Sequence, residues 1–164
     1  VSRATWGHSI IISAGLGINS GDDMRYAILM FGIILYACVE DSVPEQPVPG
    51  RWYTAAQVSD GGSLYQGHCA VCHGADGSAT AEWRTPDTNG VYPPPPLDGS
   101  AHTWHHPLDL LEQTIVDGGA KFGGVMPGFG TVLDRDERRA IIAWCQSLWS
   151  NDIYERWKAI DQRE

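Results

Sequence analysis

The sequence has few basic residues, few cysteines and no hydrophobic run long enough to cross a membrane. Its 164 residues contain 11 Lys and Arg against 20 Asp and Glu, which gives a formal net charge of −9. Nucleic acid and anionic membrane surfaces are therefore poor partners, and a basic protein surface is a favourable one. Four cysteines are too few and too unevenly spaced for a disulfide scaffold in a chain of this length. The hydrophobic content of 43% still allows a sizeable core.

The longest hydrophobic run lies near the N-terminus. It extends from Tyr26 to Ala37, follows Arg25, and is shorter than the about 20 residues that a spanning helix needs. The pattern favours the apolar region of a secretory signal, which we place at residues 24–37. Residues 1–23 show no clear periodicity and are interpreted as a leader, with a translation start at Met24 as the alternative.

The signal segment ends in Leu35-Tyr36-Ala37-Cys38, which resembles the box at which bacterial lipoproteins are cleaved and lipidated. This resemblance implies lipidation of Cys38, and the alternative is an uncleaved hydrophobic anchor. Both interpretations place the remaining chain outside the cytoplasm. The acidic, proline-bearing residues 38–52 then form an extended tether that holds a folded domain, residues 53–150, off the membrane.

The folded domain begins with a helical pattern. Thr54 and Gln57 have the spacing of a capping box, which predicts a helix from Ala55 to Gln66. Gly61 and Gly62 each destabilise such a helix by about 1 kcal/mol relative to alanine. We therefore expect another helix to approach closely at these glycines.

Two more helices are predicted after a long irregular section. Pro107 occupies a first helical position, and Gly118 ends that helix. Asp134 and Glu137 form a second capping box before a helix whose apolar stripe is expected to be buried. The C-terminal extension, residues 151–164, either lengthens this helix or forms a short separate one. The stripe consists of Ile141, Trp144, Cys145 and Leu148.

A C-x-x-C-H motif, Cys69 to His73, offers three chemistries: a redox dithiol, half of a zinc site, or covalent attachment of haem. A structural zinc site needs four ligands, usually from paired clusters, and the chain has no second C-x-x-C. A thioredoxin-like redox dithiol normally lies in a βαβ unit, and no strand pattern surrounds the motif. The motif thus favours haem, with thioether bonds to Cys69 and Cys72 and His73 as the proximal ligand.

Met126 is the candidate for the second axial ligand. It is the only methionine after the signal segment and lies in the glycine-rich sequence GGAKFGGVMPGFG. A backbone with so little side-chain bulk can approach a haem edge. A thioether ligand raises the reduction potential and leaves no vacant position on the iron. The alternatives are a methionine that packs in the core and ligation by His105 or His106 in its place.

The sequences CAVCHG and MPGF, the P-x-L at Pro95 to Leu97, and the spacing of Gly61 and Tyr65 before Cys69 make residues Tyr53–Trp149 similar to class I c-type cytochromes, above all bacterial periplasmic monohaem ones. The resemblance implies an all-α, cytochrome c-like bundle of about three to five helices around one covalently attached haem c. The residues expected to bind that haem are Cys69, Cys72, His73, Met126, Pro95, Leu97, Tyr65 and Trp104, with His73 and Met126 on the iron.

The same resemblance assigns supporting roles. It implies that the Pro95 carbonyl accepts the Nδ1 proton of His73, although the four consecutive prolines of the long section Gly74–His106 offer other carbonyls. It also implies that Gly61 lies where the first helix crosses the last, facing Ile141 and Trp144. Cys145 is then interpreted as a small buried hydrophobe.

Three histidines, His102, His105 and His106, allow a copper or zinc cluster as an alternative. We favour a surface position at the start of the Pro107 helix, where His105, His106 or Trp104 donates a hydrogen bond to a haem propionate. Arg84 and Lys121 are further candidates to meet a propionate or are solvated surface charges. Trp83 either covers a haem edge or packs the loop.

These patterns predict a membrane-tethered single-electron carrier of the bacterial periplasm rather than an enzyme. Its expected partners are redox proteins with a basic docking face, and no nucleic acid. The alternatives are a peroxidase or gas-binding haem protein with a labile distal ligand, and a metallochaperone-like lipoprotein that uses the histidine cluster.

Overall fold

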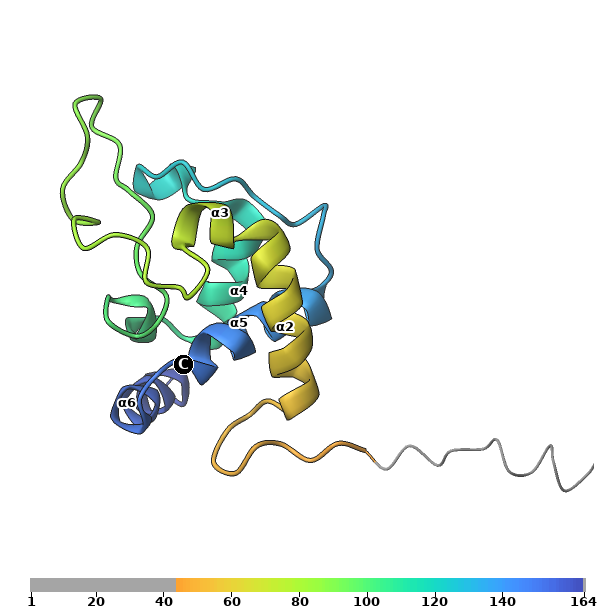
Figure 1. Ribbon diagram of the computed structural model, residues 1–164. Coiled ribbons are helices and arrows are strands. Elements are labelled where there is room, and N and C mark those ends of the chain that lie inside the picture. The colour runs from red at the N-terminus through yellow and green to blue at the C-terminus, as the bar shows by residue number, and fades with distance from the viewer. Residues whose placement is uncertain (1–43, 164) are drawn as a thin grey trace, which may run out of the picture. The chain divides into compact units, whose positions relative to one another are not determined.

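The computed structural model of the protein describes residues 44–163; the predicted leader, signal segment and Cys38 lie outside them. Within residues 44–163 the regular structure is helical and contains no strand, as predicted (Figure 1). No helix in this range has both the length and the apolar character that a membrane crossing requires. The elements are α2 (Ala55–His68), α3 (Ala70–His73), η1 (Thr103–His105), α4 (Leu108–Asp117), η2 (Ala120–Phe122), α5 (Arg135–Ser147) and α6 (Asn151–Asp161).

Helix α2 begins as predicted and ends two residues later than expected. The Thr54 side chain accepts from the Gln57 amide at 3.2 Å, and the Gln57 side chain accepts from the Thr54 amide at 2.9 Å, which completes the capping box. The helix continues to His68, and the Cys69 amide still donates to the Tyr65 carbonyl. The first cysteine of the motif is therefore held by the helix itself.

Helices α2 and α5 cross at the predicted glycines (Figure 1). A Cβ atom on Gly61 would lie 1.9 Å from the Ala140 carbonyl oxygen, a backbone atom that cannot move aside alone. A Cβ atom on Gly62 would lie 2.9 Å from Cδ1 of Trp144. The two glycines thus permit backbone contact between helices, and this packing offsets their low helix propensity.

Helix α4 starts one residue later than predicted. Pro107 has φ −65° but an extended ψ of 162°, so it is the residue that precedes the helix rather than its first member. The free amide of Leu108 is satisfied by a carboxylate oxygen of Asp161 at 2.7 Å. Gly118 ends the helix as predicted, with a φ of 80° that glycine adopts without strain.

Helix α5 has the predicted capping box between Asp134 and Glu137. Ile141 and Cys145 are buried as expected, and Trp144 is partly buried. The prediction for Leu148 was wrong: its side chain is 38% exposed. The helix ends at Ser147, so Leu148 leaves the apolar stripe.

The C-terminal residues form the separate helix α6, which packs into the fold. The Ser150 side chain caps it by accepting from the Ile153 amide. Tyr154 and Trp157 are 1% and 2% exposed. Trp52, which was expected in the extended tether, packs here too, because its amide donates to the Tyr154 hydroxyl at 3.2 Å.

Two groups of buried side chains make up the core. We call the first the tryptophan cluster; it contains Tyr53, Ala143, Trp149, Tyr154 and Trp157. We call the second the motif cluster, because partly buried Cys69 and Leu97 pack against it; it contains Tyr65, Leu133, Ile141 and Cys145. Helix α5 contributes to both, so its position couples the two groups.

Candidate functional site

The C-x-x-C-H motif lies at the junction of α2 and α3. Cys69 is partly buried, Cys72 is exposed, and both are free thiols. Burial, together with the neighbouring Cys72, raises the pKa of the Cys69 thiol to about 11. Both sulfur atoms belong to one short helical segment, since the amides of Cys72 and His73 both point to the Cys69 carbonyl.

His73 is buried and oriented by a single hydrogen bond. Its Nδ1 lies 2.9 Å from the Pro95 carbonyl oxygen, so the structure shows the predicted contact and selects Pro95 from the four prolines. A carbonyl can only accept, which assigns the proton to Nδ1. Burial lowers the pKa of His73 more than the bond to Pro95 raises it, so the ring is neutral at pH 7. Nε2 then carries the lone pair that a metal ion would take.

The segment that carries Pro95 is fastened on both sides. The Leu97 amide donates to the Gly77 carbonyl at 2.7 Å, and the indole nitrogen of Trp149 donates to the Leu97 carbonyl at 2.8 Å. The hydroxyl of Thr103 donates to the Pro96 carbonyl at 3.2 Å. These bonds fix the Pro95 carbonyl and, through it, the plane of the His73 ring.

Tyr65 supports the turn that follows His73. Its side chain is fully buried and stacks on Trp144, with ring centroids 4.0 Å apart. Burial raises the pKa of the phenol, which stays protonated and donates to the Gly74 carbonyl at 2.8 Å. The structure thus gives Tyr65 a role in holding the backbone beside the imidazole.

The glycine-rich loop that carries Met126 folds back on the end of α4. The Gly119 amide donates to the Met126 carbonyl at 2.9 Å, and the Phe129 amide donates to the Ile115 carbonyl at 2.8 Å. A Cβ atom on Gly118 would lie 2.5 Å from the Met126 carbonyl oxygen, so only glycine permits this approach. Met126 is partly buried on a backbone that hydrogen bonds hold in place.

These residues supply two free thiols, a neutral imidazole with its Nδ1 already bonded, and a thioether on a fastened loop. The family model described as "Cytochrome C oxidase, cbb3-type, subunit III" matches residues 56–145, more than half of the chain. The protein belongs to this family of class I c-type cytochrome domains. Searches of the curated proteins and of the solved structures give no match.

The cofactor of this cytochrome family is covalently attached haem c, and the chemistry of the family is haem-based electron transfer. The donors of this chain fit that cofactor, because thiols form the thioether links and a neutral imidazole and a thioether are ligands that haem iron accepts. Cys69, Cys72 and His73 are the residues that would hold it.

Among the described residues Trp104 is not one of the side chains that pack against the motif cluster. Trp104 packs against the tryptophan cluster and meets the edge of His105 at a centroid distance of 3.8 Å. Trp83 stacks on His102, with centroids 4.8 Å apart, so it packs within the long irregular section.

Among residues 44–163 no three His, Cys, Asp or Glu side chains are placed to hold a metal ion. The copper or zinc alternative for the three histidines therefore has no support in the described fold.

The two basic candidates have partners within the chain. Lys121 forms an ion pair with Asp117 at 2.8 Å, and the guanidinium of Arg84 lies 4.5 Å from the centroid of Trp83. Cys145 is 7% exposed, and burial raises the pKa of its thiol. This agrees with its interpretation as a small buried hydrophobe.

Two features of the site were missed by sequence reasoning. One is the bond from Trp149 to the Leu97 carbonyl, and the other is the cluster of arginines around Glu112 on α4. Both join residues far apart in the chain, and no local spacing signals them. A tryptophan just after the last predicted helix was the only available hint.

Proposed function

We propose that this cytochrome is a single-electron carrier in which one haem c is attached through Cys69 and Cys72 and ligated by His73 and Met126. The observation that carries the proposal is the orientation of His73 by Pro95, which leaves Nε2 as the ligand atom. The second support is the Met126 loop, whose backbone is bonded to the end of α4.

When bound, haem c supplies an iron that exchanges one electron without a change in covalent bonding. The contribution of the chain is to keep the ligand atoms in place. The Pro95 carbonyl holds the proton on Nδ1 and prevents rotation of the His73 ring. The amides of Gly119 and Phe129 hold the Met126 loop against α4. Because both segments are fixed, the ligand positions need little adjustment when the oxidation state changes.

Replacement of Met126 by Ala tests the ligand assignment. The holoprotein is expected to lose the sulfur-to-iron band at the red end of the ferric spectrum, and its reduction potential is expected to fall, because a thioether ligand raises the potential. Val125→Ala is the matched control, since Val125 is the adjacent residue and its side chain is 67% exposed. An unchanged band in Met126→Ala would refute the assignment.

The enzyme alternative makes the opposite prediction for the unaltered protein. A peroxidase or gas-binding protein needs an open or labile distal position, and the bonds that fasten the Met126 loop oppose loop opening. A high-spin ferric spectrum at neutral pH would favour the enzyme. A low-spin spectrum with the sulfur-to-iron band favours the carrier.

We propose further that the cytochrome works in the bacterial periplasm and is tethered to a membrane through Cys38 or through an uncleaved segment at residues 24–37. The support is the signal-like pattern before an acidic, proline-bearing stretch. The intact mass of the native protein tests this directly. A mass that corresponds to a chain starting at Cys38 with added acyl chains supports lipidation. A native protein that has neither a lipidated Cys38 nor residues 24–37 contradicts the tether.

The net charge of −9 supports a partner with a basic docking face. The rate of electron transfer to a basic redox protein is expected to fall steeply as ionic strength rises, because salt screens the attraction. An acidic redox protein serves as the control. Equal rates and equal salt dependence for both partners would contradict the proposal.

A further inference from the structure

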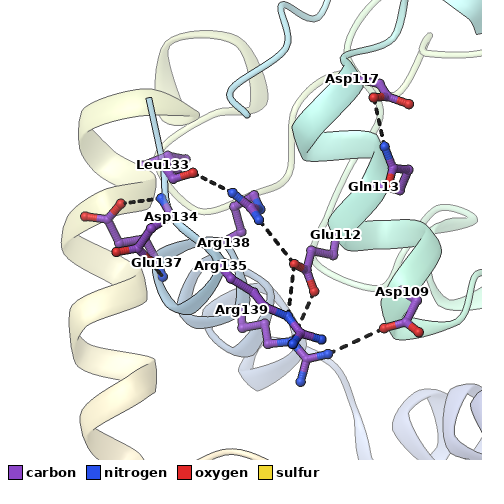
Figure 2. Close-up of polar contacts among 10 residues, drawn as sticks. All are labelled: Asp109, Glu112, Gln113, Asp117, Leu133, Asp134, Arg135, Glu137, Arg138 and Arg139. Atoms are coloured by element: carbon purple, nitrogen blue, oxygen red, sulfur yellow. Dashed lines mark hydrogen bonds and ion pairs between the residues drawn. The ribbon is translucent and has the colours of Figure 1, made fainter. Parts of the chain in front are cut away.

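One arginine joins the two ends of the segment that carries Met126. Arg138 lies on α5, and its side chain is 13% exposed. One terminal nitrogen of its guanidinium donates to the Leu133 carbonyl, and the other lies 3.3 Å from a carboxylate oxygen of Glu112 (Figure 2). Glu112 belongs to α4, which precedes the Met126 loop, and Leu133 lies at the end of that loop. Figure 2 shows the guanidinium between these two residues.

The loop between these contacts is held at intermediate points as well. The Phe129 amide donates to the Ile115 carbonyl at 2.8 Å, and the Gly130 amide donates to the Val116 carbonyl at 3.2 Å. The Leu133 amide in turn donates to the Phe129 carbonyl at 2.9 Å. Residues 129–133 connect the Met126 loop to α5 and also hold it against the end of α4. Loss of the bond between Leu133 and Arg138 therefore weakens the attachment of this segment.

Glu112 is the anchor on the other side, and it is charged at neutral pH. Its side chain is 12% exposed. Burial raises the pKa of Glu112, but the hydrogen bonds from Arg139 and Arg138 and the charge of Arg135 together outweigh this, and the pKa lies below its ordinary value. The Nε atoms of Arg139 and Arg135 lie 3.1 Å and 3.5 Å from carboxylate oxygens of Glu112.

Of the three arginines around Glu112, only Arg138 also bonds the far end of the loop within the described residues. The planar guanidinium allows this, because its two terminal nitrogens donate in diverging directions. A lysine has a single nitrogen and cannot reproduce both contacts at full strength.

We propose that Arg138 is a positioning residue for Met126: by joining Glu112 on α4 to the carbonyl of Leu133, it sets the free energy of opening the loop that carries the axial sulfur. The inference rests on the proposed function, in which Met126 ligates iron. Arg138 acts through the loop backbone. Its removal is expected to promote loss of the sulfur ligand while the haem and the helices stay in place.

The test follows the sulfur-to-iron band of the ferric holoprotein as pH is raised, since hydroxide or another strong ligand replaces methionine once the loop opens. In Arg138→Gln we expect the equilibrium constant for losing the band to rise about tenfold, because a hydrogen bond to a charged group is lost. With one proton coupled to opening, the midpoint moves about one pH unit lower. Far-UV circular dichroism checks that the fold is retained.

Arg135→Gln is the matched control. Arg135 lies on the same helix and faces the same Glu112, but its side chain is 66% exposed. The pH midpoint for loss of the band in Arg135→Gln is expected to stay close to that of the unaltered protein. Arg138→Lys is expected to fall between the two, which separates the forked geometry from the charge.

Glu112→Gln provides an independent variant if Arg138→Gln does not fold. It keeps the size of the side chain, removes the charge that anchors Arg138, and is expected to lower the midpoint in the same direction. A midpoint that moves no further in Arg138→Gln or Glu112→Gln than in Arg135→Gln would overturn this inference alone. Absence of the band from the unaltered protein would overturn the ligand assignment and the inference together.

Discussion

The tryptophan cluster and the motif cluster are built in different ways. In the tryptophan cluster Trp149, Tyr154 and Trp157 are no more than 4% exposed, and other parts of this chain cover them. The members of the motif cluster are no more than 7% exposed, but the chain neighbours of the motif cysteines and of Met126 are open, with Val71 89% exposed and Val125 67% exposed. Both halves of the core are thus buried, and only the motif cluster adjoins the residues that fit a cofactor.

The family match divides the core along the same line. Residues 56–145 contain the whole motif cluster. All four aromatic members of the tryptophan cluster lie outside this range: Tyr53, Trp149, Tyr154 and Trp157. The haem-binding half is therefore the scaffold shared with the family, and the aromatic half is contributed by the flanking residues of this chain. The buried aromatic packing thus belongs to the flanking residues and the motif to the shared segment, and the bond from Trp149 to the Leu97 carbonyl links the two.

Trp157→Ala tests this separation with the largest expected effect. Removal of a buried tryptophan is expected to lower the free energy of unfolding by about 3–5 kcal/mol. The ferric spectrum of the protein that remains folded should not change, because Trp157 belongs to the other cluster. Denaturant unfolding and optical spectra measure both.

Trp157→Phe refines the result. It keeps most of the ring and loses the bond from the indole nitrogen to the His106 carbonyl, which is 3.0 Å long. A loss of about 1 kcal/mol is expected. A changed sulfur-to-iron band in either folded variant would show that the two clusters are not separate.

Gly61→Ala perturbs the point where α2 crosses α5 and therefore affects both clusters. The added Cβ would meet the Ala140 carbonyl oxygen at 1.9 Å, so the helices must move apart. We expect a net destabilisation of about 1–3 kcal/mol despite the gain in helix propensity. Gly67→Ala is the control on the same helix, because its Cβ meets nothing within 4 Å. It should stabilise the protein by up to about 1 kcal/mol. Equal effects of the two substitutions in denaturant unfolding would contradict the crossing.

Tyr65→Phe removes one hydroxyl from the motif cluster. The Gly74 carbonyl loses its 2.8 Å donor, and unfolding is expected to become easier by about 1 kcal/mol. Since Gly74 follows His73 directly, the Soret band of the holoprotein should shift slightly as well. Tyr53→Phe, on the tryptophan cluster, should leave that band unchanged, and a shift in both variants would argue against a local effect.

The smallest effect expected is a pH dependence from His102 and His106. Burial lowers the pKa of both, and the neighbouring His105 lowers them further, with His106 and Arg84 also acting on His102. The unfolded chain therefore binds protons first as pH falls through about 6.5, and the free energy of unfolding decreases. Replacement of both by Gln should flatten the slope between pH 7.5 and 5. A slope that stays the same would contradict this.

Local spacing predicted much of this molecule. The capping boxes at Thr54 and Asp134 and the C-x-x-C-H motif each lie within five residues, and each is where the sequence placed it. The crossing at Gly61 followed from its unfavourable helix propensity together with the family resemblance. The capping boxes and the motif are determined by neighbours in the chain, whereas the crossing could be placed only with the help of the resemblance.

The features that could not be predicted depend on contacts between distant residues. Leu148 continues the apolar spacing of α5, yet the helix ends before it, and Trp149, between α5 and α6, is buried in the tryptophan cluster instead. The packing of Trp52 on α6 and the double contact of Arg138 join residues that no periodic pattern relates. Such contacts become evident only when the positions of the helices in the fold are known.

The attachment of residues 44–52 to the aromatic half has a mechanical consequence. Arg51 donates to the Asn151 side chain at 2.7 Å and its guanidinium lies 3.7 Å from the ring centroid of Tyr154, while the indole nitrogen of Trp52 donates to Gln146 at 2.7 Å. A pulling force that arrives along the polypeptide from its N-terminal side is therefore taken up by α6 and the end of α5. The thiols and the imidazole lie beyond these contacts along the chain, so such a force would reach them only after the contacts to α6 and α5 give way.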